Sequence, residues 1–330
     1  MGNVAIFVPH VGCPQRCSFC DQRAITGDSQ APTPEQVWET VQAAAAHLGE
    51  RVQQTQIAFF GGSFTAIPRE YMCALLAPAK EAVERFGFGG LRCSTRPDAV
   101  DAQVLELLKS HHMAAVELGA QSMDDRVLWR NHRGHTSADT QRAAGLIQEA
   151  GLELGLQMMT GLYGSSPEQD LETAKALIAL KPDTARIYPT VVLEHTQLAE
   201  LYEAGQYQPQ TLEEAVELCA VLLPLFESAG VRVIRMGLHA QESVESRRMA
   251  GPYHPAFREL VEGRLFLKKL LPALEQAGPG SWQVAVPPRE LSVAVGQKRC
   301  NVGALNQLGY RVRFVPDESL SRGSFRVENK

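Results

Sequence analysis

Short runs of β-branched and aromatic residues alternate with longer amphipathic stretches along the first 240 residues. The runs have the length of β-strands, whereas the amphipathic stretches have apolar residues three and four positions apart, as one face of a helix requires. Regular alternation of this kind is typical of parallel strands joined by crossover helices. We predict six strands, at residues 4–9, 56–60, 91–95, 115–118, 152–158 and 185–192, and a seventh at 232–236.

Capping signals place the helices between these strands. Thr33 followed by Pro34 predicts a helix start, because threonine caps a first turn and proline fits its first position. Ser137 is predicted to cap the helix after the fourth strand, and another helix is predicted to begin near Ser166. The remaining helices are predicted over residues 68–85, 99–110, 212–227 and 255–276.

Parallel strands with helices outside them predict an α/β fold. Because crossover connections are right-handed, we expect an open, partial (β/α)6 barrel of the TIM type rather than the closed eight-stranded barrel. In such folds, ligands bind at the carboxyl ends of the strands. Unusual residues of this chain, such as Cys13, Gly61 and Gln121, fall just after predicted strands. They are therefore expected to gather at one end of the barrel.

The alternation stops after residue 240, and the composition changes. Residues 243–255 are polar and include glycine, proline and two adjacent arginines, so we predict a loop or lid there. Gly278-Pro279-Gly280 is interpreted as a hinge. The last fifty residues predict a small, basic α+β unit, with a strand at 282–287, helices at 290–295 and 301–308, and a strand at 310–315. The predicted domains are 1–240, 241–280 and 281–330.

The chain has 330 residues, of which 45% are hydrophobic, so it can bury a sizeable core. No apolar run approaches the roughly 20 residues that span a bilayer, and we expect a soluble, cytoplasmic protein with no membrane partner. The net charge of −5 is unevenly distributed: residues 1–243 hold 18 Lys+Arg and 29 Asp+Glu, whereas residues 244–330 hold 14 and 8. The basic end fits a polyanionic partner, although a solvated surface of mixed charge has similar counts.

Three cysteines follow the first predicted strand: Cys13, Cys17 and Cys20, separated by three and then by two residues. This spacing suits a loop that binds three corners of an iron-sulfur cube and leaves the fourth iron without a protein thiolate. We interpret the loop as a [4Fe-4S] site whose open corner binds another molecule. A structural zinc ion is the alternative, with His10 or a distant cysteine as the fourth ligand. A disulfide set is disfavoured, because the chain has seven cysteines and no secretory signal.

A glycine pair follows the second predicted strand, in the run Phe60-Gly61-Gly62-Ser63. Two glycines allow a backbone to approach a ligand closely, although tight turns use them as well. Because the pair follows a strand, we expect it at the same end of the barrel as the cysteines. Together with the cysteine loop, it indicates a site for a nucleotide-like cofactor.

The cysteine loop, with Phe19 just before its third cysteine, resembles the signature of the radical S-adenosylmethionine (SAM) enzymes. Over roughly residues 4–240, the chain resembles the radical SAM portion of the catalytic subunit of Elongator, a tRNA-modifying enzyme. This resemblance rests on five motifs in order: Gly61-Gly62-Ser63-Phe64-Thr65, Thr95-Arg96-Pro97-Asp98, Val116-Glu117-Leu118-Gly119-Ala120-Gln121-Ser122, Arg133-Gly134-His135-Thr136 and Arg186-Ile187-Tyr188-Pro189-Thr190. A more distant resemblance is to oxygen-independent coproporphyrinogen oxidase.

The radical SAM resemblance implies a reaction and roles for named residues. It implies that Cys13, Cys17 and Cys20 bind the cluster, and that SAM chelates its open iron. One-electron cleavage then gives a 5′-deoxyadenosyl radical, which takes hydrogen from the substrate. Arg133 is implied to hold the methionyl carboxylate of SAM. Further SAM contacts are implied for Phe19, Gly61, Gly62, Ser63, Ser94, Gln121 and Gln157. A reducing partner such as flavodoxin or ferredoxin is also implied.

Two positions depart from the family pattern. Ser94 stands where family members have a carboxylate, and Gln157 stands where they have histidine or aspartate. Each change removes a potential charge, so a neutral hydrogen bond is expected in its place. Substrate contacts are predicted for Glu117, Arg186 and Tyr188 at the barrel rim. For Tyr188, a packing role beside the following proline is the alternative.

The Elongator subunit continues into an acetyltransferase domain, for which this chain has no room, so acetyl-CoA chemistry is not expected. The β-α-turn-α-β order of the last fifty residues resembles a KH module, whose GxxG loop clamps single-stranded nucleic acid. The corresponding loop here is Gly296-Gln297-Lys298-Arg299, with Arg299 in place of the second glycine. Lys298 and Arg299 are predicted to contact RNA phosphates. A small capping domain without a ligand is the alternative.

Three functions are consistent with these features. The favoured hypothesis is a radical SAM enzyme that modifies an RNA, with a tRNA base as the expected target. The second is the same chemistry on a small molecule, as the coproporphyrinogen relatives suggest. The third is a non-catalytic, cluster-bearing sensor or partner-binding protein on an enzyme fold.

Overall fold

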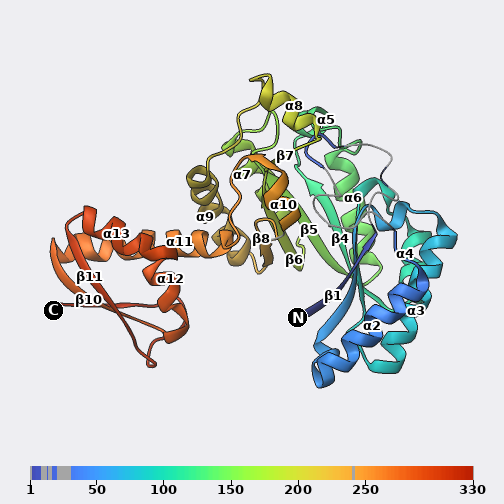
Figure 1. Cartoon of the computed structure of the whole chain (residues 1–330), viewed down its shortest axis with the longest axis horizontal. Coiled ribbons are helices and arrows are strands. Elements are labelled where there is room, and N and C mark those ends of the chain that lie inside the picture. Colours follow the sequence, from blue (N-terminus) through green and yellow to red (C-terminus); the bar gives the residue numbers. More distant parts are fainter. Residues whose placement is uncertain (1, 9–12, 14–16, 21–30, 240–241, 330) are drawn as a thin grey trace.

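The computed structural model describes residues 2–8, 13, 17–20, 31–239 and 242–329. Seven parallel strands form one sheet, in the order β1-β2-β3-β4-β5-β6-β8. Because this order follows the chain, each crossover joins neighbouring strands, and the sheet curls into a half-barrel (Figure 1). The strands are β1 (Gly2–Val8), β2 (Thr55–Gly61), β3 (Leu91–Thr95), β4 (Met113–Gln121), β5 (Glu153–Thr160), β6 (Thr184–Pro189) and β8 (Arg232–Met236). The predicted α/β partial barrel, including its seventh strand, is confirmed.

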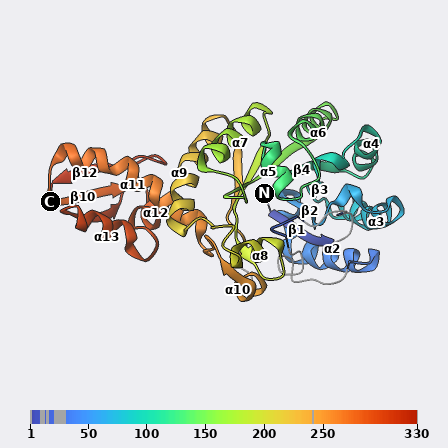
Figure 2. The same cartoon turned by 90° about the horizontal axis from the view of Figure 1, so that it is seen from above.

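Helices cover the outer face of the sheet. Figure 2 shows α2, α3, α4 and α6 outside the strands. Apolar side chains from helices and strands form the main core there, in which Phe59, Leu118 and Phe226 are fully buried. Every helix in the described ranges is too short or too polar to cross a lipid bilayer. The helices up to β8 are α2 (Pro34–Leu48), α3 (Arg69–Phe86), α4 (Ala102–Ser110), α5 (Asp125–Arg130), α6 (Ser137–Glu149), α7 (Pro167–Ala179), α8 (Gln197–Glu203) and α9 (Leu212–Ser228).

The helix starts follow local capping signals. Thr33 is the N-cap of α2: its hydroxyl accepts from Gln36 N, and the Gln36 side chain accepts from Thr33 N. Ser166 caps α7, as predicted. The predicted cap of α6 is wrong by one residue. Thr136 rather than Ser137 is the N-cap, because Thr136 and Asp139 exchange the two hydrogen bonds of a capping box.

The C-terminal residues form a second sheet with its own core. β10 (Gly280–Val286) lies between β11 (Tyr310–Pro316), which is parallel to it, and β12 (Arg326–Asn329), which is antiparallel. α12 (Leu291–Val295) and α13 (Cys300–Gln307) connect β10 to β11, and their apolar residues form one core with those of the sheet. The predicted order of strand, two helices and strand is confirmed, and β12 is a strand that the sequence did not predict.

The segment after the barrel contains more regular structure than predicted. Instead of a loop throughout, it begins with α10 (Glu242–Arg247) and β9 (Arg248–Ala250). β9 pairs with β7 (Val192–Leu193), a short strand just after β6. This pairing satisfies backbone groups that a bare loop would leave to water.

One helix joins the two cores. α11 (Phe257–Ala277) buries Phe257 and Val261 in the barrel core and buries Phe266 and Leu270 in the C-terminal core. Figure 1 shows α11 running from the side of the barrel to the C-terminal sheet, which lies apart from the barrel. Gly278 follows the helix with φ +83°. The two bodies are therefore connected by continuous helix rather than by a long flexible segment.

Candidate active site

The predicted cofactor residues lie towards the carboxyl ends of four neighbouring strands. Gly61 ends β2, Ser94 is near the end of β3, Gln121 ends β4, and Gln157 lies in the second half of β5. The strands are parallel and adjacent, so their carboxyl ends meet at one rim of the barrel. The structure thus brings these residues to the same rim, as expected.

Ser18 anchors the cysteine loop at this rim. Its hydroxyl donates to Asn131 Oδ1 at 2.7 Å, and its N–H donates to Asn131 O at 3.1 Å. Its carbonyl accepts from Leu198 N at the start of α8, at 2.8 Å. The neighbouring Phe19 is buried in an apolar cluster with Met159 of β5. The loop is therefore held by both hydrogen bonds and apolar packing.

The three predicted cluster ligands, Cys13, Cys17 and Cys20, are half-buried. None of the seven cysteines, all of which lie in the described ranges, forms a disulfide. In the described part of the chain, no three His, Cys, Asp or Glu side chains converge as ligands of a single ion would. An iron-sulfur cube instead binds each thiolate at a separate iron. His10, the alternative zinc ligand, lies outside the described residues.

Arg133 connects the cysteine loop to the sheet. Its Nη1 donates to Cys17 Sγ at 3.1 Å, and its Nη2 donates to Gly119 O at 2.6 Å. The side chain is 7% exposed, and its buried Nε has no hydrogen-bond partner among the described residues. A buried donor without an acceptor costs about 1–3 kcal/mol. This guanidinium can therefore receive one more acceptor, and a carboxylate oxygen suits it best.

Gly119 leaves space beside this arginine. A Cβ at position 119 would lie 3.0 Å from Gln121 Nε2 and 3.4 Å from Arg133 Nη2. Gln121 itself has φ +65°, which is uncommon for a residue other than glycine and is typical of strained functional sites. Its Oε1 accepts from Gln157 Nε2 at 3.2 Å. The two predicted glutamines are thus joined to each other beside the arginine.

The turn of Gly61, Gly62 and Ser63 packs closely against β1 and β3. Gly61 has φ +112°, and a Cβ there would lie 3.0 Å from Val8 O. Gly62 N donates to Val8 O at 2.9 Å. The buried Ser63 Oγ lies 2.9 Å from Thr95 Oγ1 and accepts from Arg96 N at 3.1 Å. The serine side chain therefore fixes the turn against β3.

Glu117 lies inside the barrel in a buried ion network. Its Oε1 is 3.0 Å from Arg92 Nη1, and its Oε2 is 2.7 Å from Arg186 Nε. Arg92 also contacts Glu153 at 3.0 Å. Ser94 Oγ donates to Glu117 Oε2 at 3.4 Å, so this serine contributes a neutral hydrogen bond to the network. Glu117 is only 3% exposed, and Arg186, to which it is paired, lies nearer the strand end on β6 with 12% of its side chain exposed.

Arg186 and Tyr188 share the inward face of β6. Arg186 Nη1 donates to Tyr188 Oη at 3.4 Å, and its guanidinium carbon lies 4.9 Å from the centroid of the Phe60 ring. Burial opposes the charge of Arg186, but the Glu117 carboxylate and Tyr188 hold its pKa above the usual range. Arg186 is therefore a permanent cation beside a half-buried phenol.

Two residues at this rim had no predicted role. His135 is buried, and its Nε2 lies 3.2 Å from Ala120 O. Burial, with a contribution from Arg133, lowers its pKa to about 4. Arg235 of β8 is the register partner of Arg186 on β6. The signal for Arg235 was a charged residue inside a predicted barrel strand, where apolar residues are expected.

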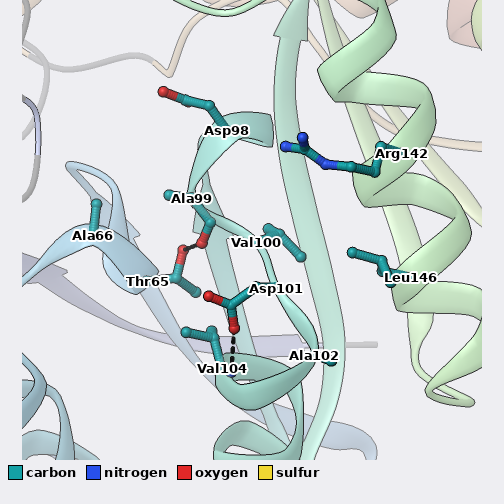
Figure 3. A pocket seen from close by; sticks show the side chains of 10 residues that line it. All are labelled: Thr65, Ala66, Asp98, Ala99, Val100, Asp101, Ala102, Val104, Arg142 and Leu146. Carbon is teal, nitrogen blue, oxygen red and sulfur yellow. Dashed lines mark hydrogen bonds between the residues drawn. The ribbon is translucent and has the colours of Figure 1, made fainter.

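A separate cavity of about 540 Å³ lies beside the end of β3. Figure 3 shows its wall, formed by residues around the 3₁₀ turn η3 (Pro97–Ala99) and by residues of α4 and α6. Thr65 Oγ1 donates to Ala99 O at 2.6 Å, and Asp98 is paired with Arg96 at 2.7 Å. None of the predicted site residues lines this cavity, so it is distinct from the rim site.

Lys298 and Arg299 are not part of the rim site. They lie in the 3₁₀ turn η5 (Gln297–Arg299), between α12 and α13, in the C-terminal unit that Figure 1 shows apart from the barrel. Both side chains are exposed. Both residues have left-handed backbones, with φ +51° and +63°. The predicted nucleic-acid loop is thus a tight turn with two adjacent exposed cations.

A family profile described as "Radical SAM superfamily" matches residues 7–177, just over half of the chain. The chain belongs to the radical SAM superfamily. A second profile, "Radical_SAM C-terminal domain", matches residues 182–266. Radical SAM enzymes use a [4Fe-4S] cluster and SAM, so the predicted enzyme class and cofactors are confirmed at the level of the family. The buried, unpartnered Nε of Arg133 and its contact with Cys17 fit this pair of cofactors.

The sequence is also similar to those of individual proteins. The chain is 27% identical over 239 residues to the tRNA uridine(34) acetyltransferase of Dehalococcoides mccartyi, covering 62% of this chain and 52% of that protein. It is 29% identical over 191 residues to the protein of the same name from Methanocaldococcus jannaschii, covering 52% and 35%. It is 27% identical over 238 residues to human Elongator complex protein 3, covering 66% and 43%. The match thus spans about half or less of these relatives.

A solved structure shares the fold. The archaeal Methanocaldococcus infernus Elp3 with an N-terminal deletion has a TM-score of 0.65 to this chain at 23% identity. The superposition covers 82% of this chain and 63% of that one. Together with the matches in sequence, it confirms the resemblance to the radical SAM portion of the Elongator catalytic subunit.

Proposed function

We propose that this radical SAM enzyme modifies a base of a tRNA. The observation that carries the proposal is the position of Arg133. Its buried guanidinium contacts both Cys17 of the cluster loop and Gly119 near the end of β4. This arrangement links the cluster loop to the polar rim that would bind SAM. The choice of tRNA is supported by relatives named as tRNA uridine(34) acetyltransferases.

The rim supplies groups for both cofactors. Cys13, Cys17 and Cys20 would hold the cluster, and Arg133 would hold the carboxylate of SAM as a permanently charged fork. The remaining contacts to SAM would come from the Gly61-Gly62 backbone, Ser63, Ser94, Gln121 and Gln157. When bound, the cofactors supply reductive cleavage of a carbon–sulfur bond and hydrogen abstraction from the substrate. Phe19 packs in an apolar cluster against which Cys17 and Cys20 also lie.

Substrate contacts are assigned to the inward face of β6. Tyr188 presents a half-buried hydroxyl, and Arg186 presents a charge that Glu117 holds in place. Glu117 is a positioning residue here, because both of its oxygens face arginines. Since SAM cleavage consumes an electron, a reductant such as flavodoxin or ferredoxin would complete the reaction.

The C-terminal unit would hold the RNA backbone. Two successive non-glycine residues with positive φ, Lys298 and Arg299, form a strained turn that projects both side chains outwards. Such a turn offers two cations to neighbouring phosphates, and the affinity it supplies would depend on salt. The KH-like order of elements around the turn supports this use.

Two measurements test the proposal. The anaerobic protein with a reconstituted cluster, dithionite and SAM is expected to release 5′-deoxyadenosine. Mass spectrometry of tRNA nucleosides is expected to show one modified nucleoside that is lost when the gene is deleted and restored by the wild-type gene. SAM cleavage with an unchanged set of nucleosides would contradict the choice of tRNA and favour a small-molecule substrate. No cleavage by protein with a full cluster would contradict the enzyme assignment.

A further inference from the structure

Arg235 is a half-buried cation inside the barrel. Its side chain has no acidic partner within the described ranges, and its only hydrogen bond there runs from Nε to Gly237 O at 3.1 Å. The next residue, Met236, packs in the main core outside the sheet. Since successive strand residues point to opposite faces, Arg235 points inwards. Its terminal nitrogens are therefore available to a ligand inside the barrel.

Arg235 lies beside a second cation. Arg186 on β6 is its register partner, and Gln157 on β5 is in turn the partner of Arg186. Neighbouring strands are about 4.8 Å apart, which places Arg235 roughly 10 Å across the sheet from Gln157. An anion bound to Arg235 would thus lie two strands away from Gln157, a predicted SAM contact. This separation leaves room for a substrate beside SAM.

The charge around Arg235 is not balanced locally. Glu117 faces Arg186 at 2.7 Å and Arg92 at 3.0 Å, so this carboxylate already serves two cations. His239 follows β8 and carries no negative charge, so it does not balance Arg235 either. Like charges on adjacent strands destabilise a sheet. An anionic ligand would relieve this repulsion.

We propose that Arg235, beside Arg186, binds a phosphodiester group of the RNA substrate and thereby sets how deeply the target nucleotide enters the barrel. This proposal rests on the proposed function, since it takes RNA as the substrate. The planar guanidinium fork of arginine suits two oxygens of one phosphate. The bound phosphate supplies the counter-charge that the described residues do not provide.

The test compares Arg235→Gln with Arg232→Gln. Arg232 is a matched control because it lies on the same strand, at the amino end of β8, where it is 63% exposed and 3.3 Å from Glu153. Binding of a tRNA anticodon stem-loop is measured at several salt concentrations, and iron content verifies that each variant is folded. For Arg235→Gln, we expect about tenfold weaker binding and a salt slope reduced by about 1. Arg232→Gln is expected to match the wild type.

A second measurement locates the phosphate. Stem-loops that carry one neutral methylphosphonate, at each loop position in turn, are bound to the wild type and to Arg235→Gln. One position is expected at which the wild type loses affinity and the variant loses none. If no position behaves in this way, or if the salt slope of Arg235→Gln equals that of the wild type, the phosphate contact is overturned and tRNA modification stands. If the wild type does not bind the stem-loop, both proposals fail.

Discussion

Arg133 donates one hydrogen bond to Cys17 Sγ at 3.1 Å, although the two residues are 116 positions apart in the chain. The same guanidinium also contacts the carbonyl of Gly119 at the end of β4. A single side chain therefore touches the cluster loop and the rim. Replacement of Arg133 should therefore weaken the binding of SAM and leave the cluster bound.

For Arg133→Gln, we expect a retained cluster and weakened SAM binding. Hydrogen bonds to charged groups contribute about 1.5–3 kcal/mol, which corresponds to roughly 10- to 150-fold in affinity. Iron and sulfide assays measure the cluster, and calorimetry measures SAM binding. Arg126→Gln, at an exposed position on α5, is the control and should bind SAM normally. Unchanged SAM affinity in Arg133→Gln would exclude the carboxylate contact.

Replacement of Cys13, Cys17 or Cys20 by alanine should each remove the iron and the brown colour, because a cube with two protein ligands is held too weakly to survive purification. Cys73→Ala is the control, since this half-buried cysteine lies in α3. Iron content and visible absorbance after anaerobic reconstitution provide the measurement. A Cys17→Ala protein that keeps both would disprove the ligand assignment.

Glu117→Gln should destabilise the fold. The substitution leaves Arg92 and Arg186 without their shared counter-ion in a buried site, and breaking a buried ion pair in this way costs about 3–5 kcal/mol. Urea unfolding gives the free energy of unfolding. Glu84→Gln removes exposed contacts with Lys80 and His112 and should cost under about 1 kcal/mol. Equal effects of the two substitutions would show that the buried network is not structural.

His135 should make stability depend on pH. Burial lowers its pKa from 6.5 to about 4, so between these values the unfolded chain binds a proton that the folded chain does not. The free energy of unfolding should therefore fall as the pH falls from 6.5 to 4, by up to about 3 kcal/mol. His135→Gln should lack this component. Urea unfolding at several pH values checks it, and parallel curves for both proteins would refute it.

Lys298→Glu combined with Arg299→Glu should weaken tRNA binding and reduce the salt slope by about 2, because two phosphate contacts are lost. The control reverses the same number of charges at Lys109 and Lys181, which precede β4 and β6 and thus lie at the amino ends of the strands. Filter binding at several salt concentrations measures both pairs. If the two double variants bind alike, the turn has no specific role in RNA contact.

Much of the barrel followed from the sequence because its signals are local. The strand at Arg232–Met236 was predicted with its observed bounds, since a short run with two β-branched residues between two predicted helices has few alternatives. By contrast, Thr136 and Ser137 are both good caps, and local pattern alone did not choose between them. β12 has only four residues and depends on pairing with β10, so its own pattern was too short to identify it.

The electrostatics of the site could not be predicted in the same way. Glu117 was expected at the rim, where its strand ends, but its partners Arg92 and Arg186 are 25 and 69 positions away in the chain. Only the assembled sheet brings them together and buries the carboxylate. No role was predicted for Arg235 for the same reason. Its place beside a second cation depends on its alignment with Arg186 on a neighbouring strand.

Because α11 is buried in both cores, its length fixes the distance between the barrel and the C-terminal unit. Its 21 residues correspond to about 30 Å, and one residue inserted at its middle would advance the C-terminal unit by about 1.5 Å and swing it by about 100°. A nucleic acid that reaches the turn at Lys298 and the barrel at once must therefore have a matching span. Selection among RNAs would then depend on their length and shape as much as on their bases.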